Sequence, residues 1–214
     1  MPESTLSVSK DAFWESDLKS ITLNDALLEI GETAFYDCKL LETVTFGNSL
    51  QKIGTGAFCS NTSLKAVNIP ETVSYIGESA FLNCTSLSDF TVPAQITEIP
   101  TSICENCTQI KEIHIPATVT DIDGRAFAGC TSLEKVAVDA VLPPLCYYED
   151  ESDTNTPFAD VAVANVLLVV PEASIEKYKS AKVWKNFKFN NTTAIDGMAN
   201  GNKQVVKTVY TDLA

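Results

Sequence analysis

The amino-acid sequence predicts an α/β repeat solenoid with short parallel strands and a C-terminal cap made of a strand and a helix. Three observations support this fold class: a 23-residue period, apolar–polar alternation inside each unit, and an aperiodic segment that follows the last unit. Fixed periods of roughly 20 to 50 residues are typical of solenoid proteins.

The period is visible as columns of apolar residues at fixed offsets. The first column is isoleucine in five successive units: Ile30, Ile53, Ile76, Ile99 and Ile122. The second is phenylalanine with one exception: Phe35, Phe58, Phe81, Cys104 and Phe127. One unit is too small to bury its own apolar face. Each coil must therefore cover its neighbour, which requires the same offset to be apolar every time.

Within each unit, the segments LKAVNIP, LSDFTVP and IKEIHIP alternate apolar with polar residues, which is the periodicity of a strand. Stacked coils pair such strands in parallel, at about 4.8 Å per coil. Pro70, Pro93 and Pro116 are expected to end the strands, because proline cannot donate to a ladder. The AFxxC stretch is expected to return along the opposite side as helical turns.

The chain divides into four parts by this reading of the repeats. Residues 1–29 form a degenerate first repeat and N-terminal cap, 30–142 the 23-residue repeats, 143–193 an acidic connector and C-terminal cap, and 194–214 a tail. In the cap, NVLLVVP is expected to form one more strand, and Ser174 to cap a helix. The apolar face of that helix is predicted to contain Ile175, Tyr178, Ala181, Trp184 and Phe187. The period itself stops after Leu142.

One unit departs from the pattern. In the unit that starts at Ile99, Pro100 replaces glycine, and Ile103 and Cys104 replace Ala-Phe. The added bulk at the neighbouring position compensates for the missing ring, so we expect a local irregularity rather than a break.

Composition excludes two classes of partner. The net charge of −13 leaves no basic patch for nucleic acid or for an anionic membrane surface. The longest apolar run, VAVANVLLVV, is much shorter than the roughly 18 to 20 residues of a spanning helix, so no membrane insertion is expected. The start, MPESTLSVSK, shows no signal peptide. The chain is therefore either cytosolic or a mature or trimmed form.

The repeated pattern IGxxAFxxCxSLxxVxIPxxVxx, over roughly residues 8–142, resembles the leucine-rich repeats of BspA-type bacterial surface antigens. The segment VLLVVPEASIEKYKSAKVWKNF resembles the closing unit of the same proteins. This resemblance implies a curved, right-handed leucine-rich-repeat superhelix without a cofactor, secretion or display at the cell surface, and binding rather than catalysis. The tail then resembles the truncated start of an anchoring segment.

The seven cysteines, an odd number, do not indicate a fully paired disulfide framework. Four of them occupy one column of the repeat, in which Asn61 fills the second unit: Cys38, Cys84, Cys107 and Cys130. We predict that these four are reduced and buried, because parallel side chains do not turn their Cβ atoms toward each other. Cys104 and Cys107 form a CENC motif, but zinc requires about four ligands and no second CxxC or histidine pair supplies them.

Candidates for catalysis and metal binding are weak. His114, the only imidazole, is predicted to lie on the polar side of its strand while Cys107 points inward, so no nucleophile–base pair is expected and no catalytic residue is assigned. An acidic run offers carboxylates for calcium but lacks the spaced ligands and glycine of a calcium loop, which favours a solvated loop: Glu149, Asp150, Glu151 and Asp153. No metal site is therefore assigned.

Two further features have alternative explanations. Five glycosylation sequons occur, and repetition accounts for three of them without glycosylation: Asn61, Asn83, Asn106, Asn190 and Asn191. Tyr147 and Tyr148 form either a contact patch at the C-terminal end or part of the packing beneath the connector.

The alternation places ten residues on the outward side of the strands: Thr43, Thr45, Ala66, Asn68, Asp89, Thr91, Glu112, His114, Lys135 and Ala137. The candidate binding residues are those around the charged portion: Asp89, Thr91, Glu112, His114 and Lys135. The sequence thus favours a monomeric, secreted or surface-displayed module that binds an extracellular protein or glycan. The alternative is a structural spacer without a ligand of its own, and an enzyme fits the residue inventory poorly.

Overall fold

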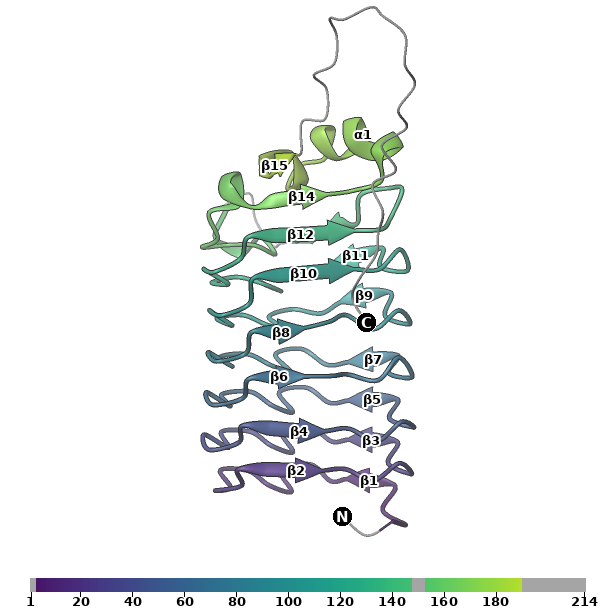
Figure 1. Cartoon of the computed structure of the whole chain (residues 1–214), viewed down its shortest axis with the longest axis vertical. Helices are drawn as coiled ribbons and strands as arrows, with labels where there is room; N and C mark the ends of the chain where they lie inside the picture. The colour runs from purple at the N-terminus through teal and green to yellow at the C-terminus, as the bar shows by residue number, and fades with distance from the viewer. Residues whose placement is uncertain (1–2, 148–152, 190–214) are drawn as a thin grey trace, which may run out of the picture.

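The computed structural model describes residues 3–147 and 153–189. The chain forms a parallel-strand solenoid of about 8 turns, in which successive coils stack along the long axis of the molecule (Figure 1). Each coil contributes one short strand to each of two sides, and a small cap closes the C-terminal end. The predicted fold class is confirmed.

Two series of strands follow the axis. The first strand face consists of β1 (Ser7–Val8), β3 (Glu29–Ile30), β5 (Lys52–Ile53), β7 (Tyr75–Ile76), β9 (Glu98–Ile99), β11 (Asp121–Ile122) and β13 (Leu145–Cys146). The second strand face consists of β2 (Ser20–Thr22), β4 (Thr43–Thr45), β6 (Ala66–Val67), β8 (Asp89–Phe90), β10 (Glu112–Ile115), β12 (Lys135–Val138), β14 (Leu167–Val169) and β15 (Lys188–Phe189). The pairs are parallel and keep the register of the repeat, since Ile30 lies opposite Ile53 and Ile53 opposite Ile76.

The return side of each coil, where the AFxxC stretch lies, consists of successive turns. The expectation of helical turns there is wrong, because two residues per coil adopt left-handed backbone angles that a helix does not allow. In the second coil these are Thr33, with φ 50°, and Asp37, with φ 57°. The amides bond to the next coil instead: Phe35 N–H donates to the carbonyl oxygen of Ala57 at 2.8 Å.

The core contains the predicted column of aromatic rings. Phe35, Phe58, Phe81 and Phe127 are fully buried. The rings of Phe35 and Phe58 stack with centroids 5.1 Å apart, and those of Phe58 and Phe81 with centroids 5.4 Å apart. Cys104 interrupts this column, and beyond it Phe127 stacks on Phe158 at 5.6 Å. The expected burial is confirmed, and the stacking runs in two segments.

Both strand faces are divided at the same level. The first face separates into the sheets β1-β3-β5-β7 and β9-β11-β13, and the second into β2-β4-β6-β8 and β10-β12-β14-β15. We call this junction the seam, the strands before it the N-terminal stack (β1 to β8), and those after it the C-terminal stack (β9 to β15).

The seam arises where backbone amides lose their partners in the preceding coil. At equivalent positions, Ser74 N–H donates to Gln51 O at 3.0 Å and Thr120 N–H to Thr97 O at 2.9 Å, but the amide of Thr97 has no such bond among the described residues. In the described part of the chain, the amide of Lys111 likewise lacks the bond to the preceding coil that its equivalents Ser88 and Glu134 make. Pro100 has no N–H at all, whereas Gly77 N–H donates to Ile53 O at 2.9 Å.

The coil that starts at Ile99 nevertheless continues through the seam. Ile103 and Cys104 are buried, and on the return side Phe81 N–H donates to Ile103 O at 2.9 Å. The expected continuity of the core is confirmed. The disturbance is larger than the expected local irregularity, because the hydrogen-bond ladders of both strand faces are interrupted.

Coils continue beyond Leu142, although the sequence period ends there. β13 pairs with β11, β14 pairs with β12, and Phe127 N–H donates to the carbonyl oxygen of Pro157 at 2.7 Å. The described residues on either side of 148–152 therefore form a seventh coil, and the sequence between Phe127 and Phe158 is longer than one 23-residue period. The extra residues move Phe158 out of the 23-residue spacing. The sequence pattern therefore does not reveal this coil.

β14 confirms the extra strand predicted at NVLLVVP, and the cap follows it. The cap contains a 3-10 turn (Glu172–Ser174), α1 (Ile175–Ser180), a second 3-10 turn (Trp184–Asn186) and β15. Two other 3-10 turns precede it, at Asp153–Asn155 and Val163–Asn165. None of the described helices is long and apolar enough to cross a membrane.

The aromatic side chains of the cap seal the last coil. Tyr178, Trp184 and Phe187 are buried. The prediction that they share one helix face with Ile175 and Ala181 is wrong, because α1 ends at Ser180 and the extended backbone at Ala181 breaks the helix before Trp184. Tyr178 Oη donates to Ala140 O at 2.8 Å, and Trp184 Nε1 to Pro144 O at 2.9 Å. Ser174 precedes α1, but its side chain makes no capping hydrogen bond, so that part of the prediction is wrong. The predicted tail, residues 194–214, lies outside the described residues.

Candidate interaction surface

The structure places the five predicted binding residues on the outside of the second strand face. Asp89 belongs to β8, Glu112 and His114 to β10, and Lys135 to β12, while Thr91 follows β8. All are exposed except Lys135, which is half-buried. The predicted outward orientation of these side chains is confirmed, and their role in binding stays a prediction.

Two lysine–glutamate pairs join neighbouring coils of this surface. Glu112 lies opposite Lys135 in the register, and Lys135 Nζ donates to Glu112 Oε2 at 3.1 Å. Lys111 and Glu134 approach to 3.9 Å in the same way. Exposed pairs of this kind contribute little to stability, but they determine where each charge is held.

His114 has a partner that sequence reasoning missed. Its Nε2 lies 2.8 Å from Oδ2 of Asp139, and both side chains are about half exposed. Asp139 is the next outward position after Lys135 and Ala137, so one further step of the alternation identifies it.

The surface is divided by the seam. Asp89 and Thr91 lie in the N-terminal stack, whereas Glu112, His114 and Lys135 lie in the C-terminal stack. The structure thus brings Glu112 and Lys135 into direct contact, and it gives Asp89 no ion pair among the described residues.

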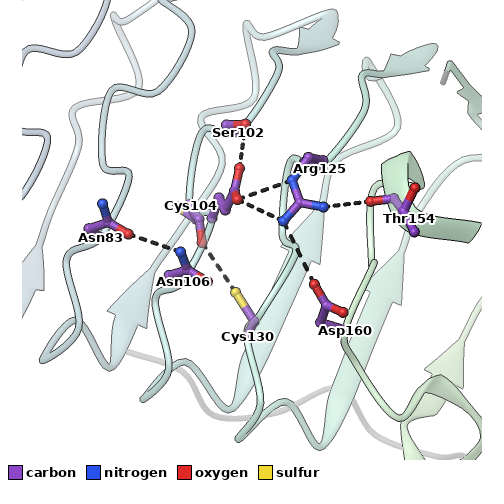
Figure 2. Close-up of polar contacts among 9 residues, drawn as sticks. Asn83, Ser102, Cys104, Asn106, Arg125, Cys130, Thr154 and Asp160 are labelled. Atoms are coloured by element: carbon purple, nitrogen blue, oxygen red, sulfur yellow. Dashed lines mark hydrogen bonds and ion pairs between the residues drawn. The ribbon is translucent and has the colours of Figure 1, made fainter. Parts of the chain in front are cut away.

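The cysteine column is part of the core. The four ladder cysteines are buried as predicted, and each is a free thiol in the structure. Each thiol donates to a carbonyl oxygen at the aromatic position of the preceding coil: Cys84 Sγ to Phe58 O at 3.1 Å, Cys107 Sγ to Phe81 O at 3.2 Å, and Cys130 Sγ to Cys104 O at 3.3 Å. Figure 2 shows the last of these bonds. Burial raises the pKa of the Cys84 and Cys130 thiols, which disfavours the reactive thiolate.

These contacts separate the residues that catalysis requires. Cys107 bonds to a buried carbonyl oxygen in the core, while His114 is on the surface with Asp139. The predicted absence of a Cys–His pair thus matches their positions. Within residues 3–147 and 153–189, no three His, Cys, Asp or Glu side chains gather as metal ligands. The acidic run Glu149–Glu151 and Tyr148 lie outside the described residues, and Tyr147 is exposed.

Asparagines support the return side from within. Asn61 takes the place of a ladder cysteine and is fully buried, and its Nδ2 donates to Phe35 O and to Phe58 O, each at 2.9 Å. Asn106 Nδ2 donates to Asn83 Oδ1 at 2.9 Å (Figure 2). The side-chain amide nitrogens of Asn61 and Asn106 are therefore used in hydrogen bonds within the protein. These bonds give the two sequon asparagines a structural role that does not involve glycosylation.

Arg125 links three successive coils on the return side. Its guanidinium donates to Glu105 Oε1 through Nε at 3.0 Å and through Nη2 at 2.8 Å, and it also reaches Thr154 O and Asp160 (Figure 2). Burial acts to raise the pKa of Glu105, but the hydrogen bonds from Arg125 and Ser102 outweigh it, so that the pKa is lowered. We call this cluster of Glu105, Arg125, Thr154 and Asp160 the clamp, and we interpret it as holding the seventh coil against the preceding ones.

The fold and the exposed strand face define a repeat solenoid of the leucine-rich class, with an apolar interior and paired charges outside. The BspA-type leucine-rich-repeat model matches residues 6–134 in six copies, and the chain belongs to this family. No match was found among curated protein sequences.

Several solved structures resemble the chain, among them the following two. A leucine-rich-repeat protein of T. pallidum is 26% identical with a TM-score of 0.60, and the match covers 62% of this chain and 65% of that one. A leucine-rich cell surface protein of Faecalibacterium prausnitzii is 25% identical with a TM-score of 0.51, and the match covers 82% of this chain and 54% of that one. The chain therefore spans less than two thirds of the length of either protein.

Proposed function

We propose that the chain is a secreted or cell-surface module that binds an extracellular protein or glycan, as a monomer, through the second strand face. The observation that carries this proposal is the run of charged side chains on β10 and β12, held in register by the pair of Glu112 and Lys135. Complementary charge at such a surface steers a partner and selects among partners. Membership of a family of bacterial surface antigens and the likeness to a cell surface protein support the location.

A binding role fits the chemistry of the surface better than catalysis does. His114 is held by Asp139 on an open face, and the described cysteines lie elsewhere, most of them within the core. Open, shallow strand faces are the surfaces that solenoid proteins offer to partners.

The experiment is a binding screen of the labelled protein against a glycan array and a panel of purified extracellular matrix proteins. For each hit, affinity is measured for the wild type and for the double reversal Glu112→Lys/Lys135→Glu, which preserves the pair while inverting its local field. The matched control is Glu42→Lys/Lys65→Glu, because this pair also joins neighbouring coils, at 2.6 Å. We expect the first reversal to weaken binding by about tenfold and the control to change it by less than about twofold.

A structural spacer is the second candidate, and one observation favours it. The charges on β10 and β12 are already paired within the molecule, and the outward residues of β4 and β6 are small: Thr43, Thr45 and Ala66. If the screen yields no ligand, or if both reversals leave every affinity unchanged, the spacer function replaces the binding function of this face.

A further inference from the structure

The outward side of the first strand face differs at its C-terminal end from the rest of the molecule. Four of the nine large apolar side chains that are exposed in the described residues lie within a single short segment that contains β13: Val141, Leu142, Leu145 and Tyr147. Leu145 and Tyr147 are 60% and 53% exposed. Clustered apolar exposure on a folded surface is typical of a contact site.

Three carboxylates adjoin these apolar side chains. Glu98, Asp121 and Leu145 lie opposite one another on β9, β11 and β13, and Asp123 follows β11. Burial and the nearby carboxylates of Asp123 and Asp121 raise the pKa of Glu98. None of the three carboxylates forms an ion pair among the described residues.

The same face carries neutralised charges in the N-terminal stack. There Lys52 Nζ lies 2.8 Å from Glu29 Oε1, and Lys10 Nζ lies 3.0 Å from Glu32 Oε1. Lys52 also lies over the ring of Tyr75, with its Nζ 5.7 Å from the centroid. On this face, cations thus accompany the carboxylates of the N-terminal stack, whereas no ion pair among the described residues includes Glu98, Asp121 or Asp123.

We propose that the outward side of β9, β11 and β13 is a docking surface for a basic segment of a partner protein that carries apolar side chains between its Arg or Lys residues. We call it the acidic–apolar patch, formed by Glu98, Asp121, Asp123, Leu145 and Tyr147. Arginine and lysine satisfy both halves of this surface, because their charged heads meet the carboxylates while their stems cover apolar area. The Tyr147 ring adds a face for a guanidinium. This site is on a different sheet from the surface of the proposed function and does not depend on it.

The probe is a short fluorescent peptide in which arginine and leucine alternate, titrated with the full chain at physiological salt and followed by anisotropy. The test variant is Glu98→Gln/Asp121→Asn/Asp123→Asn. Because the whole chain is acidic, the control must carry the same change in net charge elsewhere. Glu3→Gln/Asp17→Asn/Glu78→Gln meets this requirement with three exposed carboxylates outside the patch.

We expect the test variant to weaken peptide binding at least about fivefold, the combined effect of one exposed and two half-buried charges, and the control to weaken it less than about twofold. Equal weakening by both variants means attraction to the overall charge and overturns the proposal, as does a wild type that fails to bind. Circular dichroism melts establish that all variants fold. The reversal Glu112→Lys/Lys135→Glu should leave peptide affinity unchanged, which keeps this result separate from that of the proposed function.

The apolar half of the patch has its own control. Leu145→Ser should weaken the alternating peptide, whereas Leu40→Ser, at another exposed leucine, should not. A peptide in which glycine replaces leucine should bind the wild type more weakly than the alternating peptide does. Its affinity should be the same for Leu145→Ser and for the wild type. If Leu145→Ser weakens the glycine peptide by the same factor as the alternating peptide, the leucines of the peptide make no apolar contact with the patch. The assigned partner chemistry is then wrong.

The chain itself contains a segment of the same chemistry, KQVVKTVY, at residues 203–210. The variant Val205→Ser/Val206→Ser, which leaves the net charge unchanged, separates this internal occupant from a partner. Unchanged peptide affinity supports an external partner. Tighter binding by this variant means that the chain's own segment competes for the patch, and that result overturns the assignment to a partner.

Discussion

The two stacks of the solenoid follow the same repeat, yet the regularity of their contacts differs. In the N-terminal stack, four aromatic rings from Phe13 to Phe81 lie nearly parallel, with interplanar angles of 3° to 4°. In the C-terminal stack, the rings of Phe127 and Phe158 are inclined by 23°. A cap closes this end (Figure 1), and its Tyr178 and Trp184 rings contact each other. Between them lies the seam, where the column contains Cys104.

This difference teaches which contacts hold a coil in place. At the seam the strand ladders are interrupted on both faces, but the core and the return side continue, since Ser79 N–H donates to Thr101 O at 3.0 Å and Asn83 N–H to Glu105 O at 2.8 Å. Apolar columns and return-side bonds are therefore sufficient to stack a coil. The strand ladders add regularity to that stack.

Removal of a ring from the regular stack should have the largest effect. Phe81 stacks on Phe58 and meets the edge of Phe90 at 5.4 Å, so Phe81→Ala should lower the free energy of unfolding by about 3 to 5 kcal/mol. Urea titration measures the change. Cys104→Ala, which removes one sulfur atom from the neighbouring position, is the control and should cost clearly less. Equal costs would mean that the ring stack does not stabilise the N-terminal stack.

The compensation at the seam can be tested by restoring the repeat pattern. Ile103→Ala alone should cost about 2 to 5 kcal/mol as a cavity, and Cys104→Phe alone about 1 to 3 kcal/mol through overpacking. The double variant recreates Ala-Phe and should cost less than the sum. A double-mutant cycle in urea measures this coupling, and simple additivity would show that Ile103 does not occupy the space of the missing ring.

The clamp at Arg125 should have an intermediate effect. Arg125→Gln leaves the Glu105 carboxylate, whose side chain is only 15% exposed, without its cation, and should cost about 1 to 3 kcal/mol. Lys135→Gln, in an exposed pair, should cost less than about 1 kcal/mol. Because the pKa of Glu105 is lowered in the folded protein, its contribution is present above its unfolded pKa and is lost as pH falls. The difference between wild type and Arg125→Gln should therefore narrow in acid.

The smallest expected effect concerns the unpaired carboxylates of the C-terminal stack. The pKa of Glu98 is raised in the folded protein, so its ionisation destabilises the fold as pH rises through that pKa. Glu98→Gln should stabilise the protein at neutral pH, by no more than about 1 kcal/mol, and the gain should vanish in acid. Melting temperatures measured from pH 3 to pH 7, a range that includes the ordinary glutamate pKa of about 4, test this expected gain. Glu29→Gln, which loses a cation partner, should bring no gain.

The sequence predicted the parts of this fold that depend on repetition. The isoleucine and phenylalanine columns identified the core, because stacking demands the same residue at the same offset. The sequence predicted the seam only in part. Pro100 and Cys104 indicated a local change, but the loss of backbone hydrogen bonds at Thr97 and Lys111 depends on the position of a whole coil. The seventh coil was missed because an insertion separates Phe158 from the period.

For the candidate surface, alternation predicted which side chains face outward, and the structure confirms this orientation for each of the five residues. It did not predict their pairing. The bond of His114 to Asp139 spans 25 residues rather than 23, so it depends on side-chain reach rather than on the repeat. The acidic–apolar patch was equally invisible, because Glu98, Leu145 and Tyr147 come together only when the coils stack.

Native-state hydrogen exchange at single amides tests the seam most directly. Thr97 and Lys111 should exchange close to the rate of an unprotected amide. Their equivalents in the neighbouring coils, Ser74 and Thr120 on the first face and Ser88 and Glu134 on the second, should be strongly protected, because each donates to the preceding coil. Protection of Thr97 and Lys111 equal to that of these four amides would contradict the division into two stacks.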